Sequence, residues 1–258
     1  MPAAQLAGVR LRARRNAAAR PAASKLFMFS REDRDMQRPI RIAVCVPLYA
    51  PITPLWFSSF LALMFSFSTD KDFVFFILTS MGVPVSHGRN KVVRDWMKKA
   101  GPDKRPDFAL WLDTDNLVTK EQVLRLIDDD CDIVSALYFK KTAPCQPVAA
   151  ESIPGSNAKM PLSEYGKNSL QEIEYTGMGC CLMKWAVLEK AFEAYEYPFD
   201  FEHRKDAENQ PAYLSEDYVF CEHARALGFK IFLDTRVVSG HIGGVVDESG
   251  FEAAKGKQ

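Results

Sequence analysis

The sequence lacks a long run of apolar residues. Its most apolar stretch, residues 55–67, is 13 residues long and contains three serines, whereas a membrane-spanning helix needs about 20 mostly apolar residues in succession. The amino terminus also lacks the apolar core of a secretory signal peptide. We therefore expect neither a membrane span nor an exported protein.

Cysteine is scarce, with six residues among 258. No two cysteines have the Cys-x-x-Cys spacing of a zinc site, and together they do not form the pattern of a disulfide-rich secreted domain. Cys45 lies in the apolar run of residues 42–46, which is typical of a buried free thiol in a reducing compartment. The cysteines thus indicate a cytoplasmic protein.

Net charge is also absent, because 33 Lys and Arg balance 33 Asp and Glu. The charges are unevenly distributed, however. Residues 1–27 contain six basic residues and no acidic ones, which leaves a net charge of −6 on residues 28–258. A basic, Ala-rich segment with few aromatic residues is typical of a disordered tail. A transit peptide, a start-site artefact and a nucleic-acid-binding arm are open alternatives.

The body of the chain has an ordinary globular composition, with 47% hydrophobic and 26% charged residues. Apolar runs and helix caps predict strands and helices in alternation. The expected strands are at 40–46, 73–78, 108–112, 132–139, 172–176 and 230–233, and the expected helices are at 55–67, 89–100, 119–130, 185–194 and 215–227. This alternation is typical of an α/β domain with a mostly parallel central sheet flanked by helices.

Two details of this prediction concern packing. The helix at 55–67 is apolar on nearly all sides, so we expect it to be buried all round. Residues 144–174 and 198–212 are rich in turn-forming residues and are expected to be loops. We divide the chain into a basic, disordered arm at 1–38, one domain at 39–244 and a flexible tail at 245–258.

An Asp-x-Asp motif follows one of the predicted buried strands. Asp113-Thr-Asp115 comes directly after Phe-Ala-Leu-Trp-Leu, at the end of a strand where α/β sheets bind ligands. Paired carboxylates suit Mg²⁺ or Mn²⁺. The pattern alone is weak, because residues 128–130 also match it at a helix end, where a solvated acidic turn explains them. The buried strand before Asp113 is what favours a metal role there.

Three further groups are candidates for chemistry. Glu216 and Asp217 begin a predicted helix, where the helix dipole favours carboxylates, but either could also act as a general base. His241 stands between glycines, which allow a ligand to approach the backbone closely. Arg89-Asn90 begins another predicted helix and could contact a phosphate, although a surface arginine is the simpler interpretation.

The order of these motifs resembles that of glycosyltransferases of the GT-A fold, similar to family 2 of that class. The segments that carry the resemblance are, in chain order, Ile42-Ala-Val-Cys-Val-Pro47-Leu-Tyr49, Gly88-Arg89-Asn90, Leu110-Trp-Leu-Asp113-Thr-Asp115, Thr176-Gly177-Met-Gly179, Ser215-Glu216-Asp217, Leu227-Gly-Phe-Lys-Ile-Phe-Leu-Asp234 and Gly240-His241-Ile-Gly. The resemblance covers residues 40–244 and implies a single GT-A-like (Rossmann-like) domain.

The resemblance also implies an activity, a metal-dependent transfer of a sugar from a nucleotide-diphosphate sugar, most often a UDP-sugar, to an acceptor hydroxyl. The metal, Mn²⁺ or Mg²⁺, would be bound by Asp113, Asp115 and His241, with Asp115 as the direct ligand. The donor nucleotide would be bound by Pro47, Tyr49, Arg89, Asn90, Asp113 and Thr114. The donor sugar and the acceptor would be bound by Gly177, Met178, Gly179 and Trp185.

Glu216 and Asp217 match the catalytic pair of the family, whose Asp is the base in members that invert the anomeric carbon. His241 matches a metal-binding histidine that occurs in families that retain the configuration, so both stereochemical outcomes are open. The acceptor could be a glycan, a small molecule or a modified base in DNA. In the last case, the basic arm would contact the phosphate backbone.

Two other classes of function compete with this one. A nucleotidyltransferase-like enzyme would use the same two carboxylates and metal, but Val-Pro-Leu-Tyr-Ala-Pro stands where its Gly-rich phosphate loop would follow the first strand. A non-catalytic nucleic-acid-binding module would use the basic arm. The net charge of −6 on the remainder argues against that module.

Overall fold

The computed structural model describes residues 38–142, 144–153, 156, 158–205, 209 and 211–243. The predicted basic arm, apart from Arg38, and the predicted C-terminal tail lie outside the described residues. The proposed division of the chain at residues 38 and 244 therefore stays a prediction.

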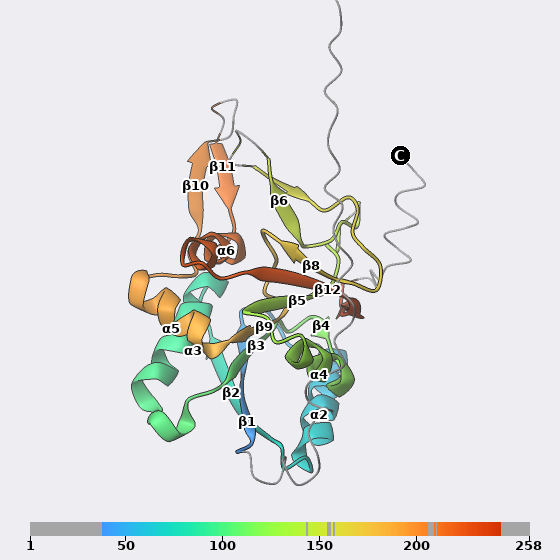
Figure 1. Ribbon diagram of the computed structural model, residues 1–258, viewed down its shortest axis with the longest axis vertical. Coiled ribbons are helices and arrows are strands. Elements are labelled where there is room, and N and C mark those ends of the chain that lie inside the picture. The colour runs from blue at the N-terminus through green and yellow to red at the C-terminus, as the bar shows by residue number, and fades with distance from the viewer. Residues whose placement is uncertain are drawn as a thin grey trace, which may run out of the picture.

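A seven-stranded sheet forms the centre of the molecule (Figure 1). Its strands lie in the order β2 (Phe73–Met81), β1 (Ile40–Leu48), β3 (Phe108–Leu112), β9 (Cys180–Lys184), β5 (Ile133–Leu137), β12 (Ile231–Val238) and β8 (Leu170–Ile173). Strand β1 is parallel to β2 and β3, and β12 is parallel to β5. Only β9 and β8 run against their neighbours in this sheet. The prediction of a mostly parallel α/β sheet is confirmed.

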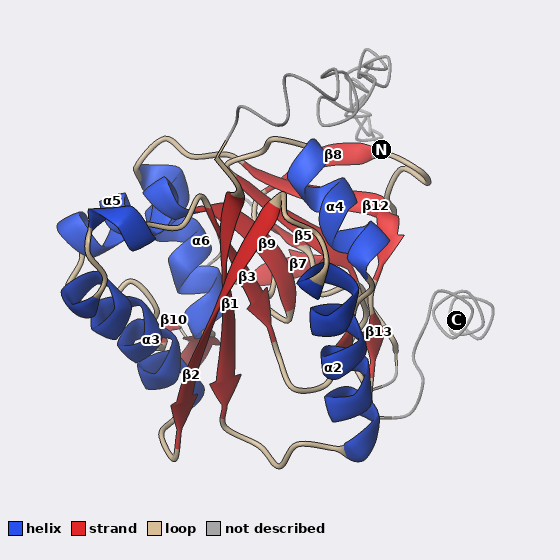
Figure 2. Ribbon diagram, turned by 90° about the horizontal axis from the view of Figure 1, so that it is seen from below, coloured by secondary structure: helices blue, strands red, loops and turns tan. Residues whose placement is uncertain are grey.

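Helices cover both faces of the sheet (Figure 2). On one face lie α2 (Pro54–Ser68) and α4 (Lys120–Asp128), and on the other lie α3 (Val85–Lys99), α5 (Trp185–Ala194) and α6 (Glu216–Ala226). Each face has its own hydrophobic core. Strands buried on both faces read as continuous apolar runs, which is why the sequence located β1 and β3 well.

The local signals for α4 are confirmed. The Thr119 hydroxyl accepts a hydrogen bond from the backbone of Gln122, and the Gln122 side chain accepts one from the backbone of Thr119. This reciprocal capping box satisfies two backbone N–H groups at the start of the helix.

Helix α3 begins one turn earlier than the sequence suggested, at Val85 rather than Arg89. Pro84 stands at the N-cap, where its fixed φ suits the entry into a helix. Gly88, which looked like part of a loop, lies inside the helix. A Cβ on Gly88 would stand 2.6 Å from the Ser80 hydroxyl, so its missing side chain lets α3 approach β2 closely. Because α3 begins at Val85, Arg89 lies in its second turn, and the Arg89 side chain is directed into the protein.

Two further expectations are wrong. Helix α2 is not buried all round, because Phe57 and Phe65 are 49% and 70% exposed. Residues 198–212 are not all loop, since β10 (Glu202–Lys205) pairs antiparallel with β11 (Pro211–Leu214). In the loop-rich segment 144–174, β6 (Ala150–Ser152) pairs with β7 (Lys159–Pro161). No helix within the described residues is long and apolar enough to cross a membrane.

A small two-stranded sheet joins distant parts of the chain beside the main sheet. Strand β4 (Asn116–Leu117) pairs antiparallel with β13 (Gly240–His241), which sets His241 opposite Asn116. Strand β4 follows the Asp-x-Asp motif at the carboxyl end of β3. The pairing therefore brings His241 to that motif across 126 positions of sequence.

Candidate active site

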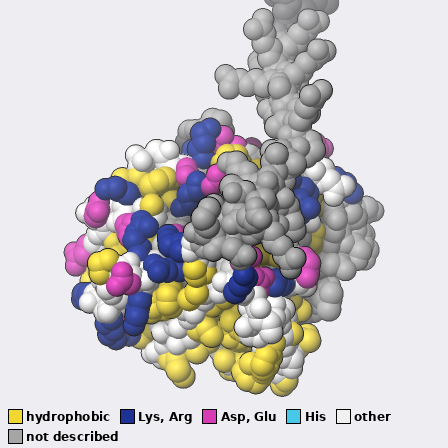
Figure 3. Space-filling model, turned by 60° about the horizontal axis from the view of Figure 1, so that its bottom comes forward, with side chains coloured by type: hydrophobic (Ala, Val, Ile, Leu, Met, Phe, Trp, Pro, Cys, Tyr) yellow, Lys and Arg dark blue, Asp and Glu magenta, His cyan; other side chains and the backbone are white. Residues whose placement is uncertain are grey.

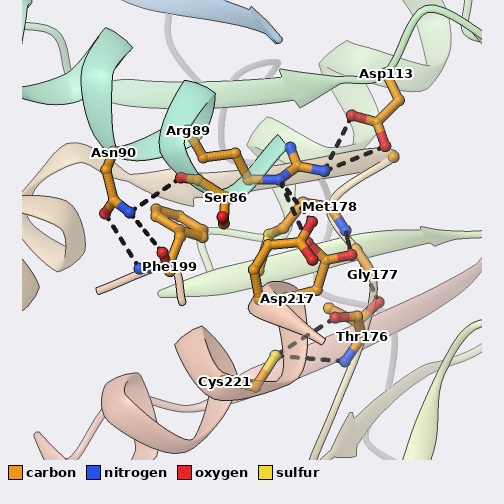
Figure 4. Close-up of polar contacts among 12 residues, drawn as sticks. Ser86, Arg89, Asn90, Asp113, Thr176, Gly177, Met178, Phe199, Asp217 and Cys221 are labelled. Atoms are coloured by element: carbon orange, nitrogen blue, oxygen red, sulfur yellow. Dashed lines mark hydrogen bonds and ion pairs between the residues drawn. The ribbon is translucent and has the colours of Figure 1, made fainter. Parts of the chain in front are cut away.

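The site lies at the carboxyl end of β1 and β3, where side chains from several elements meet. Asp113 directly follows β3, and its backbone N–H donates to the Gly179 carbonyl oxygen at 2.9 Å. This bond ties the Asp-x-Asp motif to the segment at 177–179. Glu216 and Asp217 are the first two residues of α6. Arg89 extends from α3 towards Asp113 and Asp217 (Figure 4).

Arg89 is the centre of a buried ionic cluster. Its side chain is only 1% exposed. Its Nη2 donates to both carboxylate oxygens of Asp113, at 3.1 and 3.2 Å. Its Nε lies 3.4 Å from Glu216 Oε1 and 3.4 Å from Asp217 Oδ1. The guanidinium also lies over the Trp111 ring, 5.3 Å from its centroid. Arg89 therefore connects the Asp-x-Asp motif with the Glu-Asp pair.

The cluster has too little positive charge for its carboxylates. One guanidinium faces Asp113, Glu216 and Asp217, all of them largely buried. Burial and the Asp217 charge raise the pKa of Glu216 well above its usual range. Burial, despite the opposing effect of Arg89, raises the pKa of Asp113 to about 6. The cluster therefore retains protons that isolated carboxylates would lose, and any added cation would be favoured there.

Several polar atoms of the cluster are buried without a hydrogen-bond partner. They include Arg89 Nη1 and Asp217 Oδ1. The other oxygen of Asp217 accepts a hydrogen bond from the Met178 backbone N–H at 3.2 Å. Buried polar groups in proteins are nearly always paired, so these atoms make the cluster a candidate binding site.

Asp115 and His241 form a second part of the site. His241 Nε2 lies 3.5 Å from Asp115 Oδ1, and His241 Nδ1 lies 2.7 Å from the Phe139 carbonyl oxygen. Lys141 contacts the other oxygen of Asp115. Burial alone would raise the pKa of Asp115, but hydrogen bonds from His241 and Lys141 outweigh it and lower this pKa. Asp115 is therefore held as a carboxylate.

The segment at 177–179 packs tightly against Tyr138. A Cβ on Gly177 would stand 2.2 Å from the Tyr138 hydroxyl, and one on Gly179 would stand 2.4 Å from Asn116 Oδ1. The Gly179 N–H donates to the Tyr138 hydroxyl at 2.9 Å. Glycine is needed at both positions because there is no room for a side chain, and the backbone itself lines the site.

The other predicted residues are placed as follows. Tyr49 is 44% exposed just past β1, whereas Pro47 and Thr114 are buried. Asn90 bonds the Phe199 backbone through both its amide oxygen and its amide nitrogen. Trp185 is 2% exposed in the core between the sheet and α5. Asn90 and Trp185 therefore have structural contacts, and their predicted ligand contacts stay predictions.

Sequence reasoning missed two residues of the site, Tyr138 and Lys141. Both follow β5, whose carboxyl end lies at the same end of the sheet as that of β3, with β9 between the two strands. An aromatic or basic residue just past a predicted parallel strand is the signal that could have located them. Over the described ranges, no group of three or more His, Cys, Asp or Glu side chains is gathered closely enough to hold a metal ion. Both oxygens of Asp113, a predicted ligand, face Arg89 instead.

No family model and no curated protein matches this chain. Three solved structures are similar to it in fold. A197 from STIV has 16% identity and a TM-score of 0.49 over 81% of this chain and 87% of its own. GalNAc-T7 with UDP, GalNAc and Mn²⁺ has 10% identity and a TM-score of 0.45 over 85% of this chain and 48% of its own. A glycosyltransferase involved in the glycosylation of the major capsid of PBCV-1 has 11% identity and a TM-score of 0.33. This similarity covers 84% of this chain and 99% of that protein's chain.

The chain spans about half the length of GalNAc-T7. All three similarities are remote, so the functional argument depends on the geometry of the site.

Proposed function

We propose that this protein is a glycosyltransferase that moves a sugar from a nucleoside-diphosphate donor, UDP-sugar in the first instance, to an acceptor hydroxyl. The observation that carries the proposal is the convergence of the Asp-x-Asp motif, Arg89, the Glu-Asp pair and His241 at one edge of the sheet. Their carboxylates outnumber the guanidinium, and their buried atoms Arg89 Nη1 and Asp217 Oδ1 have no hydrogen-bond partner. A donor that arrives with a divalent cation would meet both needs.

Asp115 and His241 fit such a cation. His241 Nδ1 lies 2.7 Å from the Phe139 carbonyl oxygen, which orients the ring so that Nε2 faces Asp115 Oδ1 at 3.5 Å. A cation held between these two atoms would contact both. Oxygen and imidazole nitrogen together suit Mn²⁺, and a bound cation would offset the charge on the leaving diphosphate as a Lewis acid.

Asp217 would act as the base. The Met178 N–H holds one of its oxygens, and the other is free of hydrogen bonds. Glu216, with its raised pKa, keeps a proton near neutral pH, so Asp217 is the member of the pair that accepts one. It takes the proton of the acceptor hydroxyl while that oxygen bonds to the anomeric carbon. The bond from this carbon to the diphosphate breaks, and its electron pair leaves with the diphosphate.

Tyr49 would contribute to binding of the nucleotide. Its ring is 44% exposed at the end of β1 and lies close enough to Asp113 and Asp115 for their charges to raise the pKa of its hydroxyl, after burial as the first cause. An exposed aromatic ring provides a stacking surface for a nucleobase.

The proposal is tested by thermal unfolding with UDP or GDP, each in Mn²⁺ or in chelator. Binding to the native state raises the melting temperature, and a ligand at 100 times its Kd contributes about 2.7 kcal/mol, or roughly 5–10 °C at this size. We expect a rise that requires both UDP and Mn²⁺ and that Asp115→Ala abolishes. The matched control, Asp103→Ala, changes an exposed aspartate of the short helix at Pro102–Lys104 and should keep the full rise. A folded protein that responds to neither nucleotide would contradict the proposal.

A further inference from the structure

Exposed hydrophobic side chains are concentrated in one part of the molecule. Of the twelve large hydrophobic residues that are exposed among those described, nine lie between Tyr49 and Met81. In Figure 3, hydrophobic side chains gather over the end of the molecule that carries α2, β1 and β2 in Figure 1. Monomeric proteins rarely expose contiguous apolar patches of more than a few hundred Å². We therefore expect another molecule or segment to cover this surface.

Helix α2 contributes a complete apolar stripe. Phe57, Leu61 and Phe65 follow one another at intervals of four and are 49%, 38% and 70% exposed. Residues four apart lie on the same side of a helix. The opposite side already packs into the core through Trp56 and Leu63. The 15 residues of α2 include no charged side chain, and the exposed polar side chains beside the stripe are serines.

Strand β2 is equally unprotected. It is the first strand of the seven-stranded sheet, and within the described part of the chain no strand pairs with its outer edge. Its nine residues include no charge and no proline, the usual devices that keep edge strands from pairing. Ile77 and Met81 are 53% and 73% exposed. Ring contacts from Phe67 to Phe73 and Phe75 join α2 to this strand.

We propose that this surface, formed by the α2 stripe and the outer edge of β2 and called here the edge face, binds a second copy of the chain. Strand β2 would pair antiparallel with β2 of the partner across a two-fold axis. Such an isologous contact uses the same patch on both copies. The absence of charge from α2 and β2 means that no like charges are brought together, and phenylalanine and methionine are typical of the cores of such interfaces.

The strand edge favours a second copy over a membrane surface. The outer N–H and C=O groups of β2 would lose their water in hydrocarbon without gaining a partner, which costs several kcal/mol for each group. Helices that lie on membranes also carry Lys and Arg on their polar side, and α2 has none. A second β2 strand satisfies the backbone groups directly.

The dimensions of the edge face suit a stable dimer. A nine-residue strand is about 30 Å long, and a 15-residue helix is about 22 Å long. A face of this length that is two elements wide approaches the roughly 800 Å² per partner of a standard interface.

The test is sedimentation velocity on the full chain at about 1–50 µM. We expect a dimer for the wild type and a monomer for Ile77→Lys, which puts two ammonium groups close together across the two-fold axis. The matched control is Met160→Lys, since Met160 is 50% exposed on β7, in the hairpin at the opposite end of the molecule in Figure 1. This control should stay dimeric. Phe65→Glu tests the helix in the same way, and circular dichroism checks that each variant is folded.

Each other result overturns the proposal. A monomeric wild type throughout this range, or a folded Ile77→Lys that stays dimeric, removes the edge face as the interface. A monomer that binds zwitterionic vesicles through Phe65 would identify a membrane as the occupant. If deletion of residues 1–37 converted a monomer into a dimer, the occupant would be the amino-terminal segment of the same chain. All of these readouts are independent of the proposed sugar transfer.

Discussion

Two ionic clusters of this protein, one buried and one partly exposed, differ in their balance of charge. Around Arg89, one guanidinium faces the carboxylates of Asp113, Glu216 and Asp217. Around Glu222, two carboxylates face two cations, because Arg204, 2.7 Å from Glu222, also pairs with Glu202, and Lys159 lies 2.9 Å from Glu222. Glu222 also accepts a hydrogen bond from the Tyr175 hydroxyl at 2.9 Å. The first cluster is therefore rich in negative charge, whereas the carboxylates and cations of the second are equal in number.

The difference is reflected in the protonation of the carboxyl groups. Burial would raise the pKa of Glu222, but hydrogen bonds from Arg204, Lys159 and Tyr175 outweigh it and lower this pKa to about 2. The pKa of Glu216 is raised instead. Among the described residues, buried atoms without a partner include Arg89 Nη1 and Asp217 Oδ1 but no side-chain atom of Glu222. The Glu222 cluster is complete as a fold contact that joins α6 to the β10 and β7 hairpins. The Arg89 cluster has more carboxylates than cations.

The largest expected difference between variants of the two clusters is in kcat. Asp217→Asn removes the proposed base while preserving shape, so we expect kcat to fall by about 10²–10⁴-fold with the UDP–Mn²⁺ stabilisation retained. Sugar transfer from a radiolabelled donor measures kcat, and thermal unfolding measures binding. The matched change in the other cluster, Glu222→Gln, should keep kcat in the folded protein within a few-fold of the wild type. Normal turnover in Asp217→Asn would rule out its role as the base.

The second largest expected effect is on the free energy of unfolding. Arg89→Met leaves Asp113, Glu216 and Asp217 buried without their cation, and removal of one partner of a buried ion pair costs about 3–5 kcal/mol. The loss should be greatest near pH 8 and smaller near pH 5, where the carboxyl groups of raised pKa regain protons. Urea unfolding at the two pH values measures it. A loss that does not depend on pH would show that packing of Arg89, and not its charge, matters.

The smallest effect is the acid response of the Glu222 cluster. The pKa of Glu222 is lowered on folding, so its contribution to stability is complete above about pH 4.5 and disappears as the pH falls towards 2. Glu222→Gln should lower the free energy of unfolding at pH 7 by about 2 kcal/mol and flatten its decline below pH 4.5. Urea unfolding between pH 3 and pH 7 provides the comparison. An equally steep decline in the variant would assign the acid response to other carboxylates.

The sequence predicted the sheet and the capping of α4 because these depend on neighbouring residues. Continuous apolar runs define β1 and β3, and the Thr119–Gln122 box defines the start of a helix. The sequence did not predict that Arg89 is buried. Its burial depends on the start of α3 at Pro84 and on the approach of α6, whose carboxylates are 127 and 128 positions away.

The same limit applies to the second part of the site. The motifs containing Asp115 and His241 were evident, but their 3.5 Å separation arises from the β4–β13 pairing of two short segments with no apolar pattern. Lys141 was missed because nothing in its neighbours distinguishes it from a solvated lysine. Its contact with Asp115 depends on how the strands β3 and β5 are ordered in the sheet.

That strand order also has a consequence for folding during synthesis. Strand β9 lies between β3 and β5 and pairs antiparallel with both, so it is the only link in the seven-stranded sheet between its two parallel parts. Strands β1, β2 and β3 can associate early, but β5 has no place beside them until residues 180–184 have left the ribosome. Long-range pairing of this kind slows folding. Until β9 inserts, the unpaired edges of β3 and β5 favour aggregation of the nascent chain.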